Sequence, residues 1–270
     1  ETGYIHLKTI PDADPLLIEE AGRLADRLSV NIELPSDASL KRLAPEKQIT
    51  TIRQAMGTIH QGQLAVAGEA RAPRFTPAGQ STQMIVGADA SDDRTILRNA
   101  ESLYQGYGLK RVYYSAFSPI PDSPDSVPLA APPLLREHRL YQADFLMRGY
   151  GYKAGELLSE ASNLALDIDP KLAWALSNRE VFPVDINRAE PALLARVPGI
   201  GLRSVQRLVA LRRERRVRYD DLIHLRCVLD KARPFIVTSD YRPALAEVRS
   251  GLLRARLREP QAPVQMGLWG

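Results

Sequence analysis

Four strand-like segments alternate with helical patterns in the first part of the chain, and this alternation constrains the fold more than any other feature. The strand-like segments are residues 4–10, 28–34, 83–88 and 111–117, and the helical patterns cover residues 16–25, 49–59 and 89–107. Residues 61–80 are rich in Gly, Ala, Pro and Gln and are predicted to form a loop. Strands that alternate with helices form parallel βα units. We therefore expect an α/β barrel or a doubly wound parallel sheet.

The second of these strands carries a polar face. Leu28, Val30 and Ile32 alternate with Ser29 and Asn31. A parallel strand that is covered on both faces is normally apolar throughout. In (β/α) barrels, binding groups lie at the carboxyl ends of the strands. The polar face therefore predicts a ligand site in a polar barrel lumen, and the alternative is a partly solvated sheet.

The most informative motif is Val197-Pro198-Gly199-Ile200-Gly201, which separates two segments with helical spacing of apolar residues. Glycines permit positive φ angles and leave no Cβ between the backbone and a ligand. The helix that follows begins with unpaired N–H groups and the positive end of its dipole, which suits a phosphate group. The motif resembles a helix-hairpin-helix of the competence-protein type, and such modules hold nucleic-acid backbone without reading sequence.

Basic and hydroxyl side chains follow this turn and complete the candidate site. Arg203, Ser204 and Arg207 lie on the first turns of the second predicted helix, where they can reach the same anion. The predicted DNA-binding set is Pro198, Gly199, Ile200, Gly201, Arg203, Ser204 and Arg207. The alternative is a helical hairpin whose glycines serve only packing. No second Pro-Gly-Ile-Gly sequence follows, so a partner hairpin is predicted to be absent or degenerate.

Charge is distributed unevenly along the chain. Residues 196–260 contain 16 lysines and arginines against 7 acidic residues, which gives this segment a net charge of +9. The whole chain carries +4, so the remaining residues carry −5. Part of the excess is a basic run at residues 212–218, which is interpreted as surface charge or, because it adjoins the hairpin, as a further set of phosphate contacts. A basic module attached to an acidic one predicts nucleic acid, in the first instance DNA, as the partner.

The cysteine and histidine content of the chain argues against disulfides and against a metal site. The single cysteine, Cys227, excludes an internal disulfide and predicts a reducing, cytoplasmic location. His60, His138 and His224 do not stand at metal-ligand spacing, so no metal site is expected within this chain. No apolar run in the sequence approaches membrane-spanning length, and no membrane partner is expected.

These patterns together predict four regions. They are a partial (β/α) barrel at residues 1–150, a helical linker at 151–184, an all-α helix-hairpin-helix domain at 185–240 and a C-terminal tail at 241–270. Asn187 is predicted to cap the first helix of the hairpin, with Glu190 three residues later.

Four segments outside the hairpin also resemble one protein family. Residues 3–11, 29–35, 77–87 and 169–175, together with the hairpin, are similar to the radical SAM proteins of DNA modification or repair that carry a C-terminal helix-hairpin-helix. The resemblance spans nearly the whole chain but covers only the later part of the family's architecture. It implies a partial (β/α) barrel of radical SAM type followed by an all-α helix-hairpin-helix domain.

The resemblance also implies cofactors. In that family the barrel binds S-adenosylmethionine against a [4Fe-4S] cluster and cleaves it reductively to a 5′-deoxyadenosyl radical. By the same resemblance, Asn31 and Glu33 lie against the ribose of S-adenosylmethionine. Val86 and Gly87 back the adenine, and Ser115 faces the same mouth of the barrel.

The chain departs from the family in its cysteines. The family's cluster is held by three cysteines in a Cys-x3-Cys-x2-Cys run, because iron needs thiolate ligands, and this chain has only Cys227. Either the first two βα units precede Glu1 in a longer protein, or the chemistry has been lost; the abrupt start favours the first. We predict the C-terminal part of a radical SAM enzyme that acts on nucleic acid, with a non-enzymatic DNA-binding protein as the alternative. No catalytic residue is assigned.

A third interpretation is a glycosylase of the helix-hairpin-helix type, in which an aspartate about twenty residues after the hairpin activates water. Asp220 and Asp221 stand at that distance. The basic run between them and the hairpin argues against a buried site. Asp220 is better explained as the N-cap of a helix that begins near Leu222.

Overall fold

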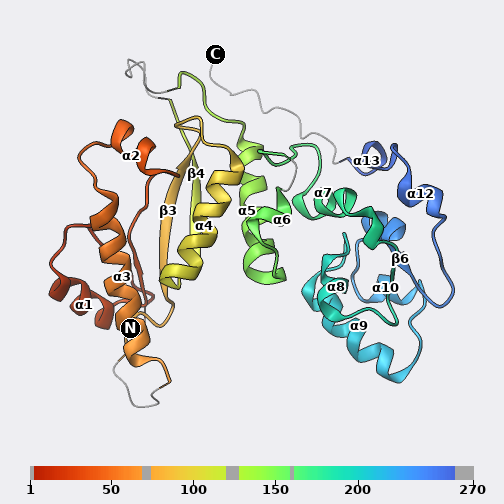
Figure 1. Cartoon of the computed structure of the whole chain (residues 1–270). Coiled ribbons are helices and arrows are strands. Elements are labelled where there is room, and N and C mark those ends of the chain that lie inside the picture. The colour runs from red at the N-terminus through yellow and green to blue at the C-terminus, as the bar shows by residue number, and fades with distance from the viewer. Residues whose placement is uncertain (1–2, 69–73, 120–127, 159–160, 259–270) are drawn as a thin grey trace. The chain divides into compact units, whose positions relative to one another are not determined.

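A computed structural model describes residues 3–68, 74–119, 128–158 and 161–258 (Figure 1). The chain divides into two units. The first comprises Glu1–Asp144 with Glu160–Asn163, and the second comprises Phe145–Ser159 with Leu164–Gly270. The boundary between them falls within one helix, α5 (Leu134–Tyr150).

A parallel four-stranded sheet forms the centre of the first unit. Its strand order is β1-β2-β3-β4, with β1 (His6–Lys8), β2 (Arg27–Ser29), β3 (Gln80–Val86) and β4 (Arg111–Ala116). The prediction of parallel βα units is therefore confirmed. The sheet is open, and the described residues do not close it into a barrel. The helices that connect the strands are α1 (Pro15–Leu24), α2 (Asp37–Leu43), α3 (Ile49–Val66) and α4 (Asp93–Tyr107).

The helices of the first unit begin largely where the sequence indicates. Asp14 caps α1 by accepting from the N–H of Leu16, and Asp92 caps α4 by accepting from the N–H of Thr95. One prediction was wrong: residues 61–66, expected in a loop, continue α3 to Val66.

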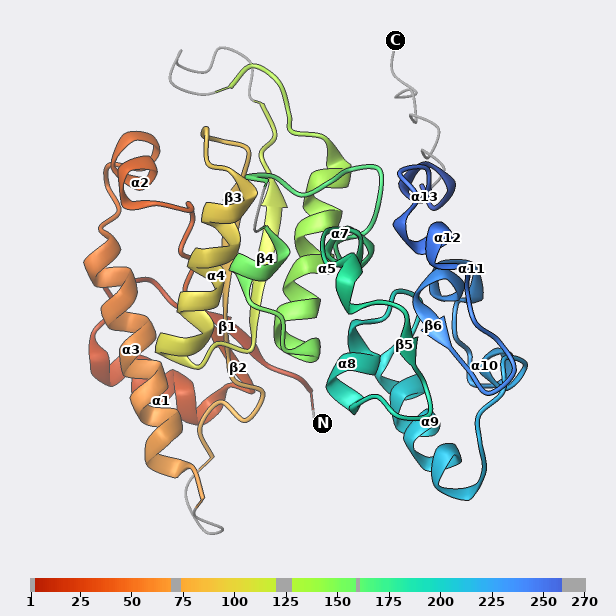
Figure 2. The same ribbon diagram turned by 45° about the vertical axis from the view of Figure 1, so that its right-hand side comes forward.

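The two faces of the sheet differ in chemistry. One face carries fully buried apolar side chains such as Leu28, Met84 and Val112. Helices α3 and α4 cover this face (Figures 1 and 2) and bury Ile52, Met56, Ile59, Ile96 and Leu97. Side chains alternate between faces along a strand, so the opposite face carries polar residues, among them Ser29, Ser81, Gln83 and Tyr113.

The outer edge of β4 is covered by side chains rather than by another strand. Backbone N–H groups of β4 donate to oxygens on α4 and α5: Val112 to Tyr104 Oη at 3.0 Å, Tyr114 to Tyr141 Oη at 3.0 Å, and Ala116 to Glu137 Oε2 at 2.8 Å. Tyr141 Oη also donates to the carbonyl oxygen of Tyr114 at 2.9 Å. These bonds occupy the donors through which an edge strand would pair with another chain.

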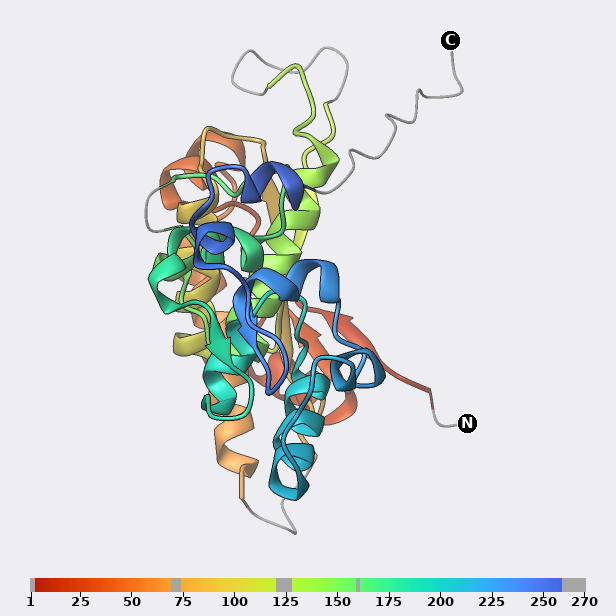
Figure 3. The ribbon, with the colours of Figure 1, turned by 90° about the vertical axis from the view of Figure 1, so that its right-hand side faces the viewer.

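The second unit is mainly helical but is not free of strands. The short strand β5 (Val184–Asp185) pairs in parallel with β6 (Ile236–Val237), so the region expected to be all-α contains one ladder. Figure 3 gives another view of the helices of this unit, whose colours run from green through cyan to blue. The helices are α6 (Ala154–Leu157), α7 (Pro170–Ser177), α8 (Pro191–Arg196), α9 (Leu202–Glu214), α10 (Asp221–His224), α11 (Leu229–Ala232), α12 (Leu245–Arg249) and α13 (Leu253–Arg256), with 3-10 turns at Arg179–Val181 and Arg233–Phe235.

The division of the chain differs in detail from the predicted regions. Residues 151–158 and 164–184 belong to the second unit together with the hairpin. The region predicted as a tail contains α12 and α13, and residues 259–270 lie outside the described residues. Asn187 does not cap α8: Glu190 occupies the N-cap position, and the Asn187 side chain bonds both the N–H and the carbonyl of Val217.

Candidate nucleic-acid interface

The predicted hairpin consists of α8, the turn at residues 197–201 and α9. Val197, Pro198 and Ile200 are buried, so the apolar side of the turn faces the interior of the second unit. Gly199 has a φ of 78°, in the left-handed region that glycine adopts at low cost. The buried apolar side chains of the motif thus fix the position of the turn, and the functional contacts expected of the turn are those of its backbone.

The two glycines of the turn have different surroundings. A Cβ on Gly199 would lie 2.3 Å from the carbonyl oxygen of Val228, and the Gly199 carbonyl accepts from the N–H of Val228 at 2.9 Å. A Cβ on Gly201 would have only Tyr150 Oη within 4 Å, at 3.8 Å. Gly199 therefore serves close packing of the backbone, whereas the half-buried Gly201 leaves room for a side chain.

The start of α9 is uncapped. Gly201 is its N-cap residue, and no side chain within the described ranges accepts from the first N–H groups of the helix. These donors lie at the positive end of the helix dipole. Arg203 and Arg207 stand on the same turns, are exposed, and make no ion pair or hydrogen bond within the described part of the chain. Three features that favour an anion therefore meet at one helix end.

Ser204, the remaining predicted residue, has another partner. Its side chain is buried, and its hydroxyl donates to the carbonyl oxygen of Leu225 at 2.8 Å. The hydroxyl joins α9 to the segment that follows α10. Only the backbone N–H of Ser204 is left for an anion.

Several arginines of the basic run at residues 212–218, which begins in the last turn of α9, bond other residues of the protein. Arg212 donates to the carbonyl oxygen of Ala189 at 2.5 Å. Arg218 pairs with Asp240 at 3.1 Å, and Arg215 binds Asp221. Arg213 and Arg216 are exposed and have no ion-pair partner among the described residues. Within the run, these two side chains are therefore the ones that an interface can use without breaking an ion pair of the described residues.

The aspartates after the run have structural roles. Both carboxylate oxygens of Asp221 accept from Arg215, at 2.7 and 2.8 Å, and Oδ2 also accepts from the N–H of Arg218 at 2.8 Å. These bonds hold the pKa of Asp221 at about 2. Asp220 occupies the N-cap position of α10, as predicted, but its side chain makes no cap bond. The Asp221 carboxylate instead accepts from the N–H of Arg218, which precedes the helix.

Lys171 supports the turn from α7, and sequence reasoning did not identify it. Its Nζ donates to the carbonyl oxygen of Ile200 at 2.6 Å and lies 4.7 Å from the centre of the Tyr150 ring. Burial lowers the pKa of Lys171 to about 8, against the opposing effect of Asp169. Because Lys171 precedes the turn by 29 residues, no local pattern signals this contact.

The predicted cofactor residues lie along the sheet of the first unit. Asn31 is buried and its Nδ2 lies 3.5 Å from Gln83 Oε1 on the polar face. Ser115 pairs with Ile85 in the β3–β4 register, so its half-buried side chain lies on the same face as Gln83.

The other three residues have different partners. Glu33, with a φ of 65°, forms an ion pair with Lys47 at 2.7 Å. Val86 is fully buried in the core beneath the helices. Gly87 directly follows β3, and a Cβ there would lie 2.5 Å from the ring of Pro132. Of the five predicted cofactor residues, Asn31 and Ser115 are therefore the two whose contacts and register place them on the polar face.

The residues of this chain do not fit an iron–sulfur cluster. Cys227 lies in the second unit, half-buried, and burial raises the pKa of its thiol while Ser204 and Lys171 lower it. The described residues contain no group of three or more His, Cys, Asp or Glu side chains that could hold a metal ion. A cluster with three thiolate ligands cannot form on one cysteine.

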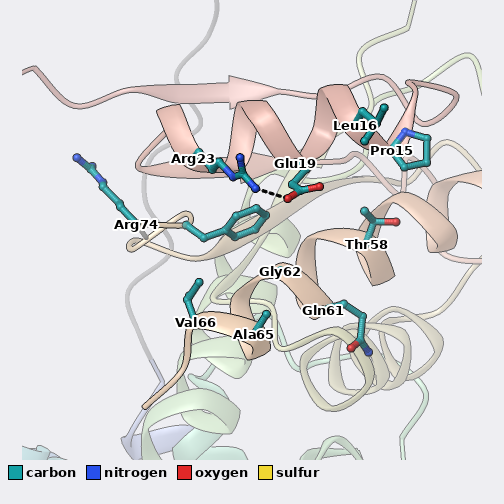
Figure 4. Close-up of a pocket in the computed structure, with 11 residues that line it drawn as sticks. Pro15, Leu16, Glu19, Arg23, Thr58, Gln61, Gly62, Ala65, Val66 and Arg74 are labelled. Carbon is teal, nitrogen blue, oxygen red and sulfur yellow. Dashed lines mark hydrogen bonds and ion pairs between the residues drawn. The ribbon is translucent and has the colours of Figure 1, made fainter. Parts of the chain in front are cut away.

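A pocket of about 500 Å³ lies in the first unit between α1 and α3 (Figure 4). Its lining includes Leu16, Val66 and Phe75, with Glu19 paired to Arg23 at the rim. None of the predicted site residues lines it.

Along the described ranges, no helix combines the length and the apolar character needed to cross a membrane. Comparison of the chain with models of protein families, with curated proteins and with solved structures found no match.

Proposed function

We propose that the second unit binds the sugar-phosphate backbone of DNA through the hairpin of α8 and α9. The observation that supports this most is the uncapped start of α9, where the open backbone of Gly201 stands beside the exposed side chains of Arg203 and Arg207. A phosphate oxygen there accepts from backbone N–H groups and is attracted by the helix dipole and by two guanidinium groups.

Backbone binding of this kind is not sequence-specific. N–H groups at a helix start and arginines that contact phosphates set position and affinity but do not read base edges. The buried turn residues Val197 and Ile200 keep the N–H groups fixed before the ligand arrives, which lowers the cost of ordering them on binding.

The experiment that tests this proposal is binding of a labelled duplex of mixed sequence, followed by fluorescence anisotropy at several salt concentrations. Replacing both exposed arginines (Arg203→Gln with Arg207→Gln) should reduce the slope of log affinity against log salt by about two, since each phosphate contact contributes about 0.9. The matched control is Arg242→Gln with Arg249→Gln, which removes two exposed arginines elsewhere in the same unit. Equal slopes in the two double variants would refute the proposal.

For the first unit we propose binding of S-adenosylmethionine at the polar face of the sheet. The support is the presence of polar side chains, including Asn31 and Ser115, on the face opposite the helices. We assign no radical step, because the single cysteine cannot hold the cluster that such chemistry requires. Calorimetric titration with S-adenosylmethionine tests the proposal. Binding that is weakened by Asn31→Leu supports it, and absence of binding to the wild-type chain rejects it.

A further inference from the structure

The segment after the hairpin contains a second turn that shares two features with the first, a positive φ and its spacing from the next helix, although its sequence lacks the glycines. Gly199, with a φ of 78°, precedes the first residue of α9 by three positions. Arg226, with a φ of 59°, precedes the first residue of α11 by three positions. Of the two predicted outcomes for the partner hairpin, absent or degenerate, the structure favours the second: α10 and α11, of four residues each, flank a turn with arginine in the place of glycine.

The two turns lie against each other. The N–H of Val228, in the second turn, donates to the carbonyl oxygen of Gly199 at 2.9 Å. Ser204, on the first turn of α9, donates to the carbonyl oxygen of Leu225 at 2.8 Å. Arg226 directly follows Leu225 in the chain. Its backbone is therefore held beside the uncapped start of α9.

The Arg226 side chain is not used by the described part of the protein. It is exposed and makes no ion pair or hydrogen bond with any described residue. A side chain with a Cβ is disfavoured at a φ of 59°, where glycine or asparagine costs less. The fold thus holds a guanidinium, in a backbone conformation that does not suit arginine, next to the proposed phosphate site.

We propose that Arg226 is a contact for a second phosphate of the same nucleic acid. The first hairpin then binds one phosphate through its backbone N–H groups together with Arg203 and Arg207. The second hairpin binds the next phosphate through the guanidinium of Arg226, which stands at the turn position that glycine occupies in the first. The inference rests on the proposed DNA binding of the first hairpin. It adds a contact outside the predicted set, on a segment that the sequence did not identify as a hairpin.

The test separates charge from backbone conformation. Arg226→Gly and Arg226→Asn both remove the charge and both accept a positive φ. We expect the melting temperature of each variant to equal or exceed that of the wild type. The affinity for a mixed-sequence duplex should fall about eightfold at 0.1 M salt, and the salt slope should decrease by about one. Arg226→Lys keeps a cation and should retain most of the affinity.

Arg249→Asn, on α12, is the matched control, since it removes an exposed arginine of the same unit away from both turns. If the wild type binds DNA and the Arg203/Arg207 double variant is weakened, but both Arg226 variants keep the wild-type affinity and slope, this inference is overturned while the proposed function stands. If the wild type does not bind the duplex, the proposed function itself fails. A fall in affinity equal to that of Arg249→Asn would also overturn the role of Arg226.

Discussion

Gly199 and Val228 are in backbone contact: a methyl group on Gly199 would stand 2.3 Å from the Val228 carbonyl oxygen. We predict that Gly199→Ala destabilises the second unit by about 2–4 kcal/mol, because it adds a steric overlap to a left-handed φ that alanine disfavours. Urea unfolding followed by the fluorescence of Trp174, which is buried in this unit, measures the change. Gly251→Ala is the control, since no atom lies within 4 Å of a Cβ there. Equal stability of the two variants would contradict the prediction.

Gly201 should behave in the opposite way. Its φ of −88° is open to any residue, and a Cβ would meet only Tyr150 Oη, at 3.8 Å. We therefore expect Gly201→Val to change the unfolding free energy by less than about 1 kcal/mol. Its branched side chain should cover the first N–H groups of α9 and reduce DNA affinity about tenfold, which is the loss of about 1.4 kcal/mol of binding free energy. Anisotropy at low salt measures this, with Gly251→Val as the control; unchanged affinity would argue against phosphate binding at these N–H groups.

This contrast shows what the sequence could predict of the site. The position of the turn follows from local spacing, because apolar residues on both sides recur at helical intervals. The separate roles of the two glycines depend on Val228 and Tyr150, which lie far away in the chain. The same holds for Ser204, whose hydroxyl bonds Leu225. Side-chain partners of this kind are set by tertiary packing and leave no mark in a local pattern.

In the fold, as in the site, features set by local patterns were predicted and features set by distant contacts were missed. The strands were identified because the apolar period of two agrees with burial on one face of the sheet. The end of α3 was missed, since the Gly- and Gln-containing residues 61–66 have no strong helical period and the helix there packs near Phe75. Asn187 has the composition of an N-cap, but its side chain bonds Val217, 30 residues later. Local propensity was overridden by a contact across the unit.

Acid should weaken the second unit through Asp221. Its folded-state pKa of about 2 lies below the usual 3.8, so the ionised form is favoured by folding. The stabilisation is therefore fully present above pH 4 and is lost as the pH falls from about 4 to about 2. We expect the difference in unfolding free energy between the wild type and Asp221→Asn to shrink over this range.

Urea unfolding midpoints at several pH values measure this difference. Asp167, whose pKa is also about 2 because of Arg254 and Arg258, titrates in both proteins and cancels in the comparison. Asp220→Asn serves as the control, since Asp220 makes no cap bond to α10. A difference between wild type and Asp221→Asn that is constant from pH 7 to pH 2 would be inconsistent with this assignment.

The edge of β4 gives the last prediction. Tyr141 Oη accepts from the N–H of Tyr114 and donates to its carbonyl, so one phenol satisfies both outward groups of a strand residue. Tyr141→Phe removes this oxygen and keeps the ring. Both backbone groups then lose their partner, and an unsatisfied buried group costs about 1–3 kcal/mol. We expect the first unit to lose stability in that range, as measured by circular dichroism in urea. In Tyr107→Phe, where the phenol makes no hydrogen bond within the described ranges, stability should not change. If Tyr141→Phe were as stable as this control, the prediction would be wrong, because the backbone groups of Tyr114 would then be satisfied by water once the phenol oxygen is removed.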